Sequence, residues 1–148
     1  MTTGMRQFVT KEQASFTELI DHQESIILDL ETLHYYSLNA AATFLWKHLR
    51  AGSATTEVDL AEQLATAFAI SSATAARDTR QFVEELQQEQ LLAETTAQVA
   101  KRSGFVFPNS DELPAYESPA VKSSHSVMEL NLAGGASTGA SGALGGGS

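Results

Sequence analysis

The sequence contains no cysteine, and proline occurs only three times in its 148 residues. The lack of cysteine excludes a disulfide framework, a thiolate metal site and a cysteine nucleophile, and it fits a reducing compartment. The N-terminus has no apolar run of signal-peptide length, and no later run approaches the roughly 20 apolar residues of a membrane span. We therefore expect a cytoplasmic protein that does not enter a membrane.

Positive charge is also scarce. Nine Lys and Arg residues against 18 Asp and Glu residues give a formal net charge of −9, and apart from Lys101 and Arg102 the basic residues stand singly. A protein that binds the phosphate groups of nucleic acid normally carries a basic patch. Nucleic acid is therefore not an expected partner.

The usual patterns of catalytic and metal chemistry are missing as well. No histidine pair has the spacing of two ligands on one helix, because the four histidines are far apart: His22, His34, His48 and His125. His48 lies on an apolar helical stripe and is expected at the edge of the core. No glycine-rich phosphate loop follows a strand. We expect no metal, no cofactor and no catalytic activity.

The first forty residues show strand patterns. We predict a flexible N-terminus over residues 1–13 and then a strand over Ala14–Asp21. In the next strand, Ile26–Glu31, every second residue is expected to face the core, beginning with Ile26. The aromatic run His34–Leu38 predicts a third strand. Together these three segments predict a small antiparallel meander.

Three helices are expected to follow the meander. Asn39 suits the N-cap of the first helix and Gly52 its C-terminal stop. Thr56 is expected to open the second helix, and Ser71 or Ser72 the third. In the third helix the polar side chains, Asp78 among them, are placed outside the apolar stripe. The predicted fold class is α+β and winged-helix-like, a three-stranded antiparallel meander followed by three helices, with a flexible C-terminal tail.

Beyond Leu92 the apolar periodicity ends. The predicted organisation is a domain over residues 14–92, a linker over 93–112, a distinct segment over 113–133 and a Gly/Ser/Ala-rich tail over 134–148. The last part, GGASTGASGALGGGS, has no charge, which is typical of low-complexity sequence.

The block YSLNAAATFLWKHLRAG and the later run DTRQFVEELQQEQLL resemble the PqqD family. The first pattern is carried by Tyr36, Leu38, Asn39, Leu45, Trp46 and Gly52, and the second by Asp78, Phe82, Leu86, Leu91 and Leu92. The family includes the peptide chaperone of pyrroloquinoline quinone biosynthesis, and its relatives bind leader peptides of ribosomally made, post-translationally modified peptides (RiPPs). The resemblance extends over roughly residues 14–92.

The resemblance implies a peptide-binding site rather than an active site. A leader peptide would add as one more strand to the open edge of the third strand and contact the third helix. Carried over by position, the groove comprises His34, Tyr35, Tyr36, Ser37, Leu38, Arg80, Val83, Glu84 and Gln87. For Tyr35 and Tyr36 the alternative is that one belongs to the core and the other is simply exposed.

The segment LPAYESPAVKSS resembles the leader peptides of lasso-type systems, in which a tyrosine, a proline and a leucine recur at fixed spacing. Tyr116, Pro119 and Val121 match that spacing, with valine in the last place. This resemblance implies that the chain carries a leader-like ligand of its own domain in cis. MELNLAGG (residues 128–135) further resembles the end of a double-glycine leader. The tail beyond it lacks the side-chain carboxylate that a lasso ring needs.

The implied partners are a precursor leader peptide and a RiPP-modifying or leader-processing enzyme. One alternative is a winged-helix DNA-binding regulator, which predicts a basic recognition helix, whereas the third helix offers only Arg77 and Arg80. A second alternative is an interaction domain that dimerises through its exposed strand edge.

Overall fold

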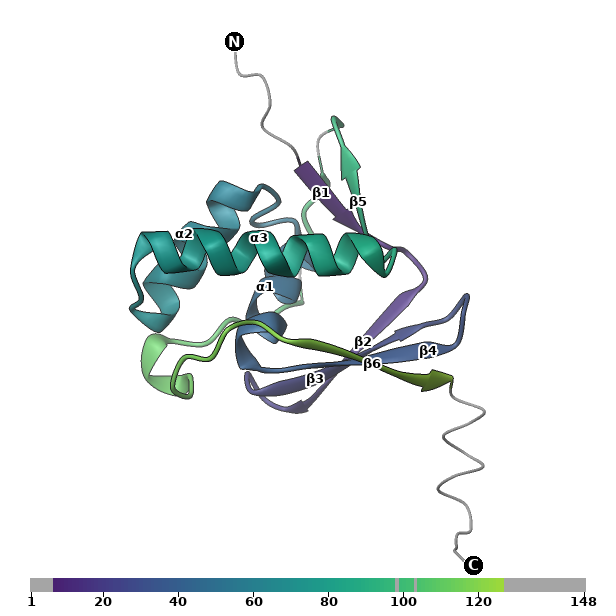
Figure 1. Cartoon of the computed structure of the whole chain (residues 1–148), viewed down its shortest axis with the longest axis horizontal. Helices are drawn as coiled ribbons and strands as arrows, with labels where there is room; N and C mark the ends of the chain where they lie inside the picture. The colour runs from purple at the N-terminus through teal and green to yellow at the C-terminus, as the bar shows by residue number, and fades with distance from the viewer. Residues whose placement is uncertain (1–6, 98, 103, 127–148) are drawn as a thin grey trace, which may run out of the picture.

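The computed structural model describes residues 7–97, 99–102 and 104–126. All three helices lie on the same side of a four-stranded antiparallel sheet of order β2-β3-β4-β6, and a two-stranded sheet, β1-β5, lies near the C-terminal end of α3 (Figure 1). In chain order the elements are β1 (Gln7–Thr10), β2 (Ala14–Ile20), β3 (Glu24–Asp29), β4 (His34–Leu38), α1 (Ala40–Ala51), α2 (Glu57–Phe68), α3 (Ser72–Gln88), β5 (Leu92–Thr95), the short 3₁₀ helix η1 (Ser110–Glu112) and β6 (Val121–Ser126). The predicted α+β class, with a meander followed by three helices, is confirmed. Within the described ranges, no helix is both long and apolar enough to cross a bilayer.

The helix starts follow the local sequence. Asn39 caps α1 by accepting from the backbone N–H of Ala42, at 3.1 Å. Thr56 and Ser71 cap α2 and α3 in the same way. Such caps satisfy backbone donors that have no partner within the helix, so short-range sequence is enough to place a helix start.

Gly52 ends α1 in the left-handed conformation, with φ of 76°. A β-carbon at this position would lie 2.5 Å from the carbonyl oxygen of Ala100. The glycine is therefore required twice, for the backbone turn and for the close approach of a segment that lies far away in the sequence.

We expect Gly52→Ala to lower the free energy of unfolding by about 2–3 kcal/mol, since the left-handed conformation costs roughly 1–2 kcal/mol for a residue with a β-carbon and the Ala100 carbonyl must also move. Gly104→Ala is the matched control, because Gly104 has φ of 96° but nothing within 4 Å of the added carbon. Urea denaturation of both variants measures the difference. Equal losses would show that the contact with Ala100 adds nothing.

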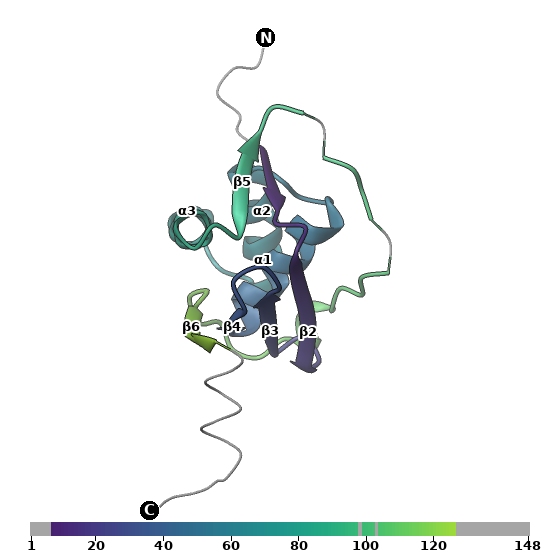
Figure 2. The same cartoon turned by 90° about the vertical axis from the view of Figure 1, so that its right-hand side faces the viewer.

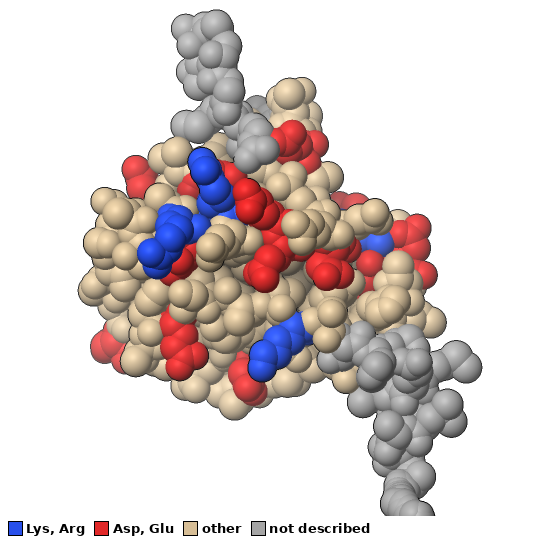
Figure 3. All heavy atoms as spheres, viewed as in Figure 1, with Lys and Arg blue, Asp and Glu red and all other residues tan. Residues whose placement is uncertain are grey.

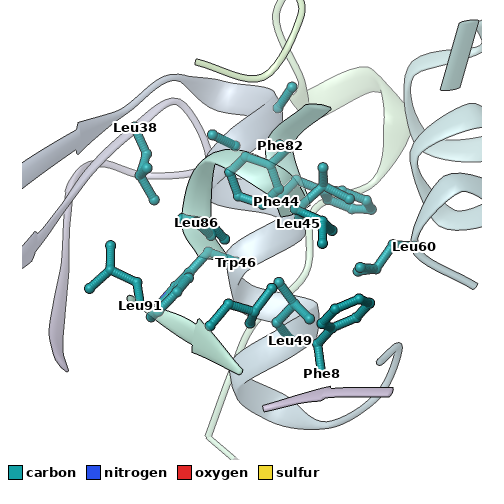
Figure 4. Close-up of a cluster of buried hydrophobic side chains, with 14 of the residues drawn as sticks. Phe8, Leu38, Phe44, Leu45, Trp46, Leu49, Leu60, Phe82, Leu86 and Leu91 are labelled. Atoms are coloured by element: carbon teal, nitrogen blue, oxygen red, sulfur yellow. The ribbon is translucent and has the colours of Figure 1, made fainter. Parts of the chain in front are cut away.

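The core lies between the helices and the four-stranded sheet. Trp46 and Leu45 of α1 are fully buried, and α3 contributes Phe82 and Leu86 (Figure 4). The largest of the fully buried side chains, Trp46, comes from α1, and the next largest aromatic side chains are Phe8 of β1 and Phe82 of α3. The helices and the small β1-β5 sheet therefore share one core.

The prediction of a flexible N-terminus is wrong for residues 7–10. They form β1, which pairs with β5, and Phe8 is fully buried. The backbone N–H of Phe8 also donates to the carbonyl of Thr55, at 2.9 Å. A four-residue strand is hard to recognise locally, because the strand that pairs with it lies more than 80 residues further along the chain.

The predicted inward face of β3 is also wrong. Ile27 and Asp29 are buried, whereas Leu30 is 54% exposed. The Asp29 carboxylate is held by Lys11 Nζ at 2.9 Å and by the backbone N–H of Glu31. A buried carboxylate is tolerated when it is fully hydrogen-bonded, and these partners are invisible in the strand pattern.

Residues 93–112, expected as a linker, contain β5 and a segment that lies against the domain. We call residues 99–102 and 104–113 the strap. In Figure 2 it descends on the side opposite α3 before the chain returns to β6. The backbone N–H of Arg102 donates to the carbonyl of Ala51, at 2.7 Å, and the Arg102 guanidinium pairs with Glu12. The polar composition of residues 93–112 predicted a loose linker. The partners that hold the segment could not be recognised from it, because they lie on elements that are distant in the sequence.

Candidate functional site

The edge of β4, the third strand of the meander, is occupied by β6 of the same chain. The two strands are antiparallel, and the register pairs Leu38 with Val121 and Ser37 with Lys122. A register shift separates His34 from Tyr36. We call residues 114–126, which enter this position after the strap, the docked segment.

Asn39 fastens the start of the docked segment. Its backbone N–H donates to the carbonyl of Ala120 at 3.3 Å, and its side-chain amide donates to the carbonyl of Ser118 at 2.8 Å. The side-chain oxygen accepts from the backbone N–H of Ala120 at 3.0 Å while it also caps α1. One residue thus joins the end of β4, the start of α1 and the docked segment.

Asp78 of α3 is the polar centre of the site and is only 3% exposed. Its carboxylate accepts from the Tyr116 hydroxyl at 2.6 Å, from the Ser118 hydroxyl at 3.1 Å and from Arg77 Nε at 3.1 Å. Burial alone would raise the pKa of Asp78, but the hydrogen bonds from Tyr116, Arg77 and Ser118 outweigh it and lower the pKa below its ordinary value. Asp78 is therefore ionised at neutral pH. Burial, followed by the hydrogen bond to Asp78, raises the pKa of the Tyr116 phenol.

The side chains of the docked segment also make apolar contacts. The Tyr116 ring packs edge-on against Phe68 of α2, with centroids 5.3 Å apart. Val121 packs against the hydrophobic core. Pro119 lines a shallow hollow with four residues of α3: Gln81, Glu84, Glu85 and Gln88. Aromatic, proline and aliphatic side chains thus each have a distinct place on the domain.

The structure distributes the predicted groove residues over several environments. In β4, His34 and Ser37 are exposed, Tyr36 and Leu38 are buried, and Tyr35 is half-buried on the sheet face away from the helices. All five belong to the strand that pairs with β6, so their backbone, more than their side chains, forms this side of the site.

The predicted residues of α3 do not all face the docked segment. Val83 is fully buried in the core, and Arg80 Nε lies 3.8 Å from Glu57 of α2. Glu84 is exposed beside Pro119, and Gln87 is half-buried. The apolar stripe of a helix identifies its core face, but it does not tell which polar flank meets a neighbouring strand.

The docked segment also contacts residues that were not predicted to belong to the groove, among them Asn39, Phe68 and Asp78. Asn39 was already accounted for as a helix cap, and Asp78 was placed outside the apolar stripe of α3, whereas it is buried. An acidic residue at Asp78 was part of the family resemblance, and that signal was the only one that pointed to it.

The surface over α3 is divided by charge. Figure 3 shows basic side chains over its N-terminal half and acidic side chains over its C-terminal half, where Glu84, Glu85 and Glu89 are exposed. Both arginines of the helix have carboxylate partners, Asp78 for Arg77 and Glu57 for Arg80. No group of three or more metal-binding side chains occurs among the residues that the structure describes.

Comparison with known proteins identifies the class of domain that holds the docked segment. Residues 24–92 match a family described as "Coenzyme PQQ synthesis protein D (PqqD)". These residues form a PqqD-like domain, and the resemblance stated from the sequence is confirmed there. Tyr36, Asn39 and Asp78 lie inside the matched range, whereas β6 lies outside it.

A solved structure supports the same fold. It is described as "TbiB1 in Complex with the TbiA(beta) Leader Peptide", and it superposes with a TM-score of 0.51 at 24% sequence identity. The similarity covers 57% of this chain and 93% of the other. The comparison with curated proteins gives no match.

Proposed function

We propose that this chain is a RiPP recognition element that binds leader-type peptides by strand addition to β4, against the flank of α3. We further propose that the docked segment is such a ligand, carried in cis. Main-chain pairing supplies affinity and the side-chain contacts supply selectivity, as in other cases of β-augmentation.

The observation that carries the proposal is the pairing of β6 with β4 together with the hydrogen bond from Tyr116 to Asp78. The groove side of both contacts belongs to the PqqD-like domain, while the ligand side belongs to the leader-like motif Tyr116, Pro119 and Val121. The solved relative in complex with a leader peptide supports a peptide as the kind of partner.

The proposed groove consists of the β4 backbone, His34 to Leu38, with Asn39 at its end and with Asp78, Glu84 and Gln87 on α3. The predicted double-glycine leader end, residues 128–135, lies outside the described residues, as does the tail. A ligand held in cis would keep the residues C-terminal to it close to the domain, where a modifying or leader-processing enzyme would meet both together.

A competition titration tests the proposal. The full chain with Tyr116→Ala and Val121→Ala is expected to release the docked segment while the domain stays folded, with the buried Trp46 as the fluorescence probe of folding. A labelled peptide of residues 113–126 should then bind this variant. It should bind the unchanged chain at least tenfold more weakly, because tethering gives the cis segment an effective concentration in about the millimolar range.

The matched control is Val58→Ala with Val106→Ala, which removes two exposed side chains that lie 49% and 68% open to solvent. This control should behave as the unchanged chain. Suppose that the released variant is folded and that the backbone N–H of Asn39 exchanges freely with solvent. The proposal is wrong if the added peptide then neither binds nor shifts the NMR signals of the backbone amides of His34 to Leu38.

A further inference from the structure

The strap places one aromatic side chain, Phe107, against α1. The ring stacks on His48 with centroids 4.2 Å apart and an interplanar angle of 26°. Lys47 Nζ lies 5.7 Å from the Phe107 centroid. The preceding residue, Val106, is 68% exposed. Within this apolar run, Phe107 therefore contacts the domain, whereas the neighbouring Val106 is exposed to solvent.

The surface beneath Phe107 is held in place by the domain. His48 is 8% exposed, and its Nδ1 lies 2.7 Å from the Ser53 hydroxyl, which fixes the ring. Burial, and to a lesser degree the charge of Lys47, lowers the pKa of His48 to about 4, so the ring is neutral at pH 7. The Lys47 ammonium is held by Glu18, at 3.3 Å. An aromatic ring placed here stacks on a neutral imidazole beside a fixed cation, and both contacts are favourable.

Phe107 is one end of a continuous row of five rings. His48 contacts Phe44 with centroids 4.7 Å apart, and Phe44 contacts Phe68 at 5.9 Å. Phe68 then contacts Tyr116 at 5.3 Å. The three middle rings belong to the PqqD-like domain, whereas Phe107 and Tyr116 come from the C-terminal extension and occupy the two ends.

The chain between the two end rings has its own local structure. Tyr116 follows Phe107 by nine positions. Between them η1 forms a turn in which the Glu112 side chain accepts from the Asn109 backbone N–H at 2.7 Å, and η1 lies against α2. The spacing between the two aromatic side chains is thus set by a structured turn that rests on the domain.

We propose that the peptide-binding site is bipartite, with the His48–Lys47 surface as a second subsite for an aromatic side chain nine residues ahead of the tyrosine. The proposal rests on the proposed function and extends it. The ligand class becomes a peptide with two aromatic anchors joined by a turn-forming spacer, and the site extends from the β4 edge across α2 to α1.

Peptide titrations separate this inference from the function on which it rests. The receptor is the full chain with Phe107→Ala, Tyr116→Ala and Val121→Ala, which removes both aromatic cis anchors and, as in the release variant above, frees the β4 edge. The probes are a peptide of residues 104–126, the same peptide with Phe107→Ala, and the same peptide with Val106→Ala as the matched control. Loss of Phe107 should weaken binding about tenfold to a hundredfold, as expected for a stacked aromatic contact with a neighbouring cation. The Val106→Ala peptide should bind like the unchanged peptide.

A receptor-side comparison tests the subsite itself. His48→Ala added to the receptor should weaken the 104–126 peptide but leave a 114–126 peptide unaffected, and His48→Phe should retain the affinity for both. Equal binding of the 104–126 peptide with and without Phe107 would overturn the second subsite while the proposed function stands. If none of the peptides binds, the proposed function itself fails. Should His48→Ala not fold, as judged by Trp46 fluorescence, the peptide-side comparison decides alone.

Discussion

Replacing Asp78 with alanine is expected to detach the docked segment from α3. The carboxylate accepts two hydrogen bonds from the segment, from Tyr116 at 2.6 Å and from Ser118 at 3.1 Å. Hydrogen bonds to a charged group contribute roughly 1.5–3 kcal/mol, and the Tyr116 hydroxyl would remain half-buried without this acceptor. We expect the docking equilibrium to weaken by about 2–3 kcal/mol, or roughly 30- to 150-fold.

Amide hydrogen exchange measures this change at Asn39, whose backbone N–H donates to Ala120 in the docked state. Tyr116→Phe, which removes only the hydroxyl, should produce a smaller loss in the same direction. Glu62→Ala removes an exposed carboxylate from α2 and serves as the control. Protection of Asn39 that is unchanged in Asp78→Ala would mean that the strand pairing alone holds the segment.

Lys122→Pro is expected to break the pairing of β6 with β4. Lys122 is paired with Ser37, and the Asn39 N–H donates to Ala120 two residues earlier. Hydrogen-bonded and non-hydrogen-bonded pairs alternate along an antiparallel ladder, so Lys122 directs its backbone N–H toward β4. Proline lacks that N–H and would place its ring inside the ladder. We expect docking to weaken by about 2–3 kcal/mol, roughly a hundredfold.

Ser123→Pro provides the matched control one position further along. Ser123 pairs with Tyr36, a position where the same alternation directs the N–H away from β4 to the open edge. Proline is tolerated on that side of an edge strand, so this variant should keep most of its docking. Binding of a labelled peptide of residues 113–126 reports the freed groove for both variants. If the two prolines have equal effects, the segment is not held by the ladder.

Some of the candidate site was readable in the sequence and some was not. The strand His34–Leu38 was identified because a strand pattern is local. The motif Tyr116, Pro119 and Val121 was noticed because its spacing resembles that of lasso-type leaders, and its role as a ligand stays a prediction. Asp78 was placed on the solvent side of α3, because helical periodicity marks the face toward the core and α3 also packs against a strand that arrives from the end of the chain.

The contact of Phe107 also could not be predicted from the local sequence. Phe107 belongs to the apolar run FVFP (residues 105–108) of an otherwise polar stretch, but its partner, His48, lies on α1, nearly sixty positions earlier. No local pattern links them. The strap also passes Gly52, where the missing side chain leaves room for the backbone at Ala100.

The sequence by itself determined the three helices, their caps and the meander, because these depend on interactions among near neighbours along the chain. Only the tertiary structure decided that β1 pairs with β5, that Asp29 rather than Leu30 is buried, and that β6 lies on the edge of β4. Each of these joins segments that are distant in sequence, and which pairing is adopted depends on the buried surface and hydrogen bonds of the whole fold.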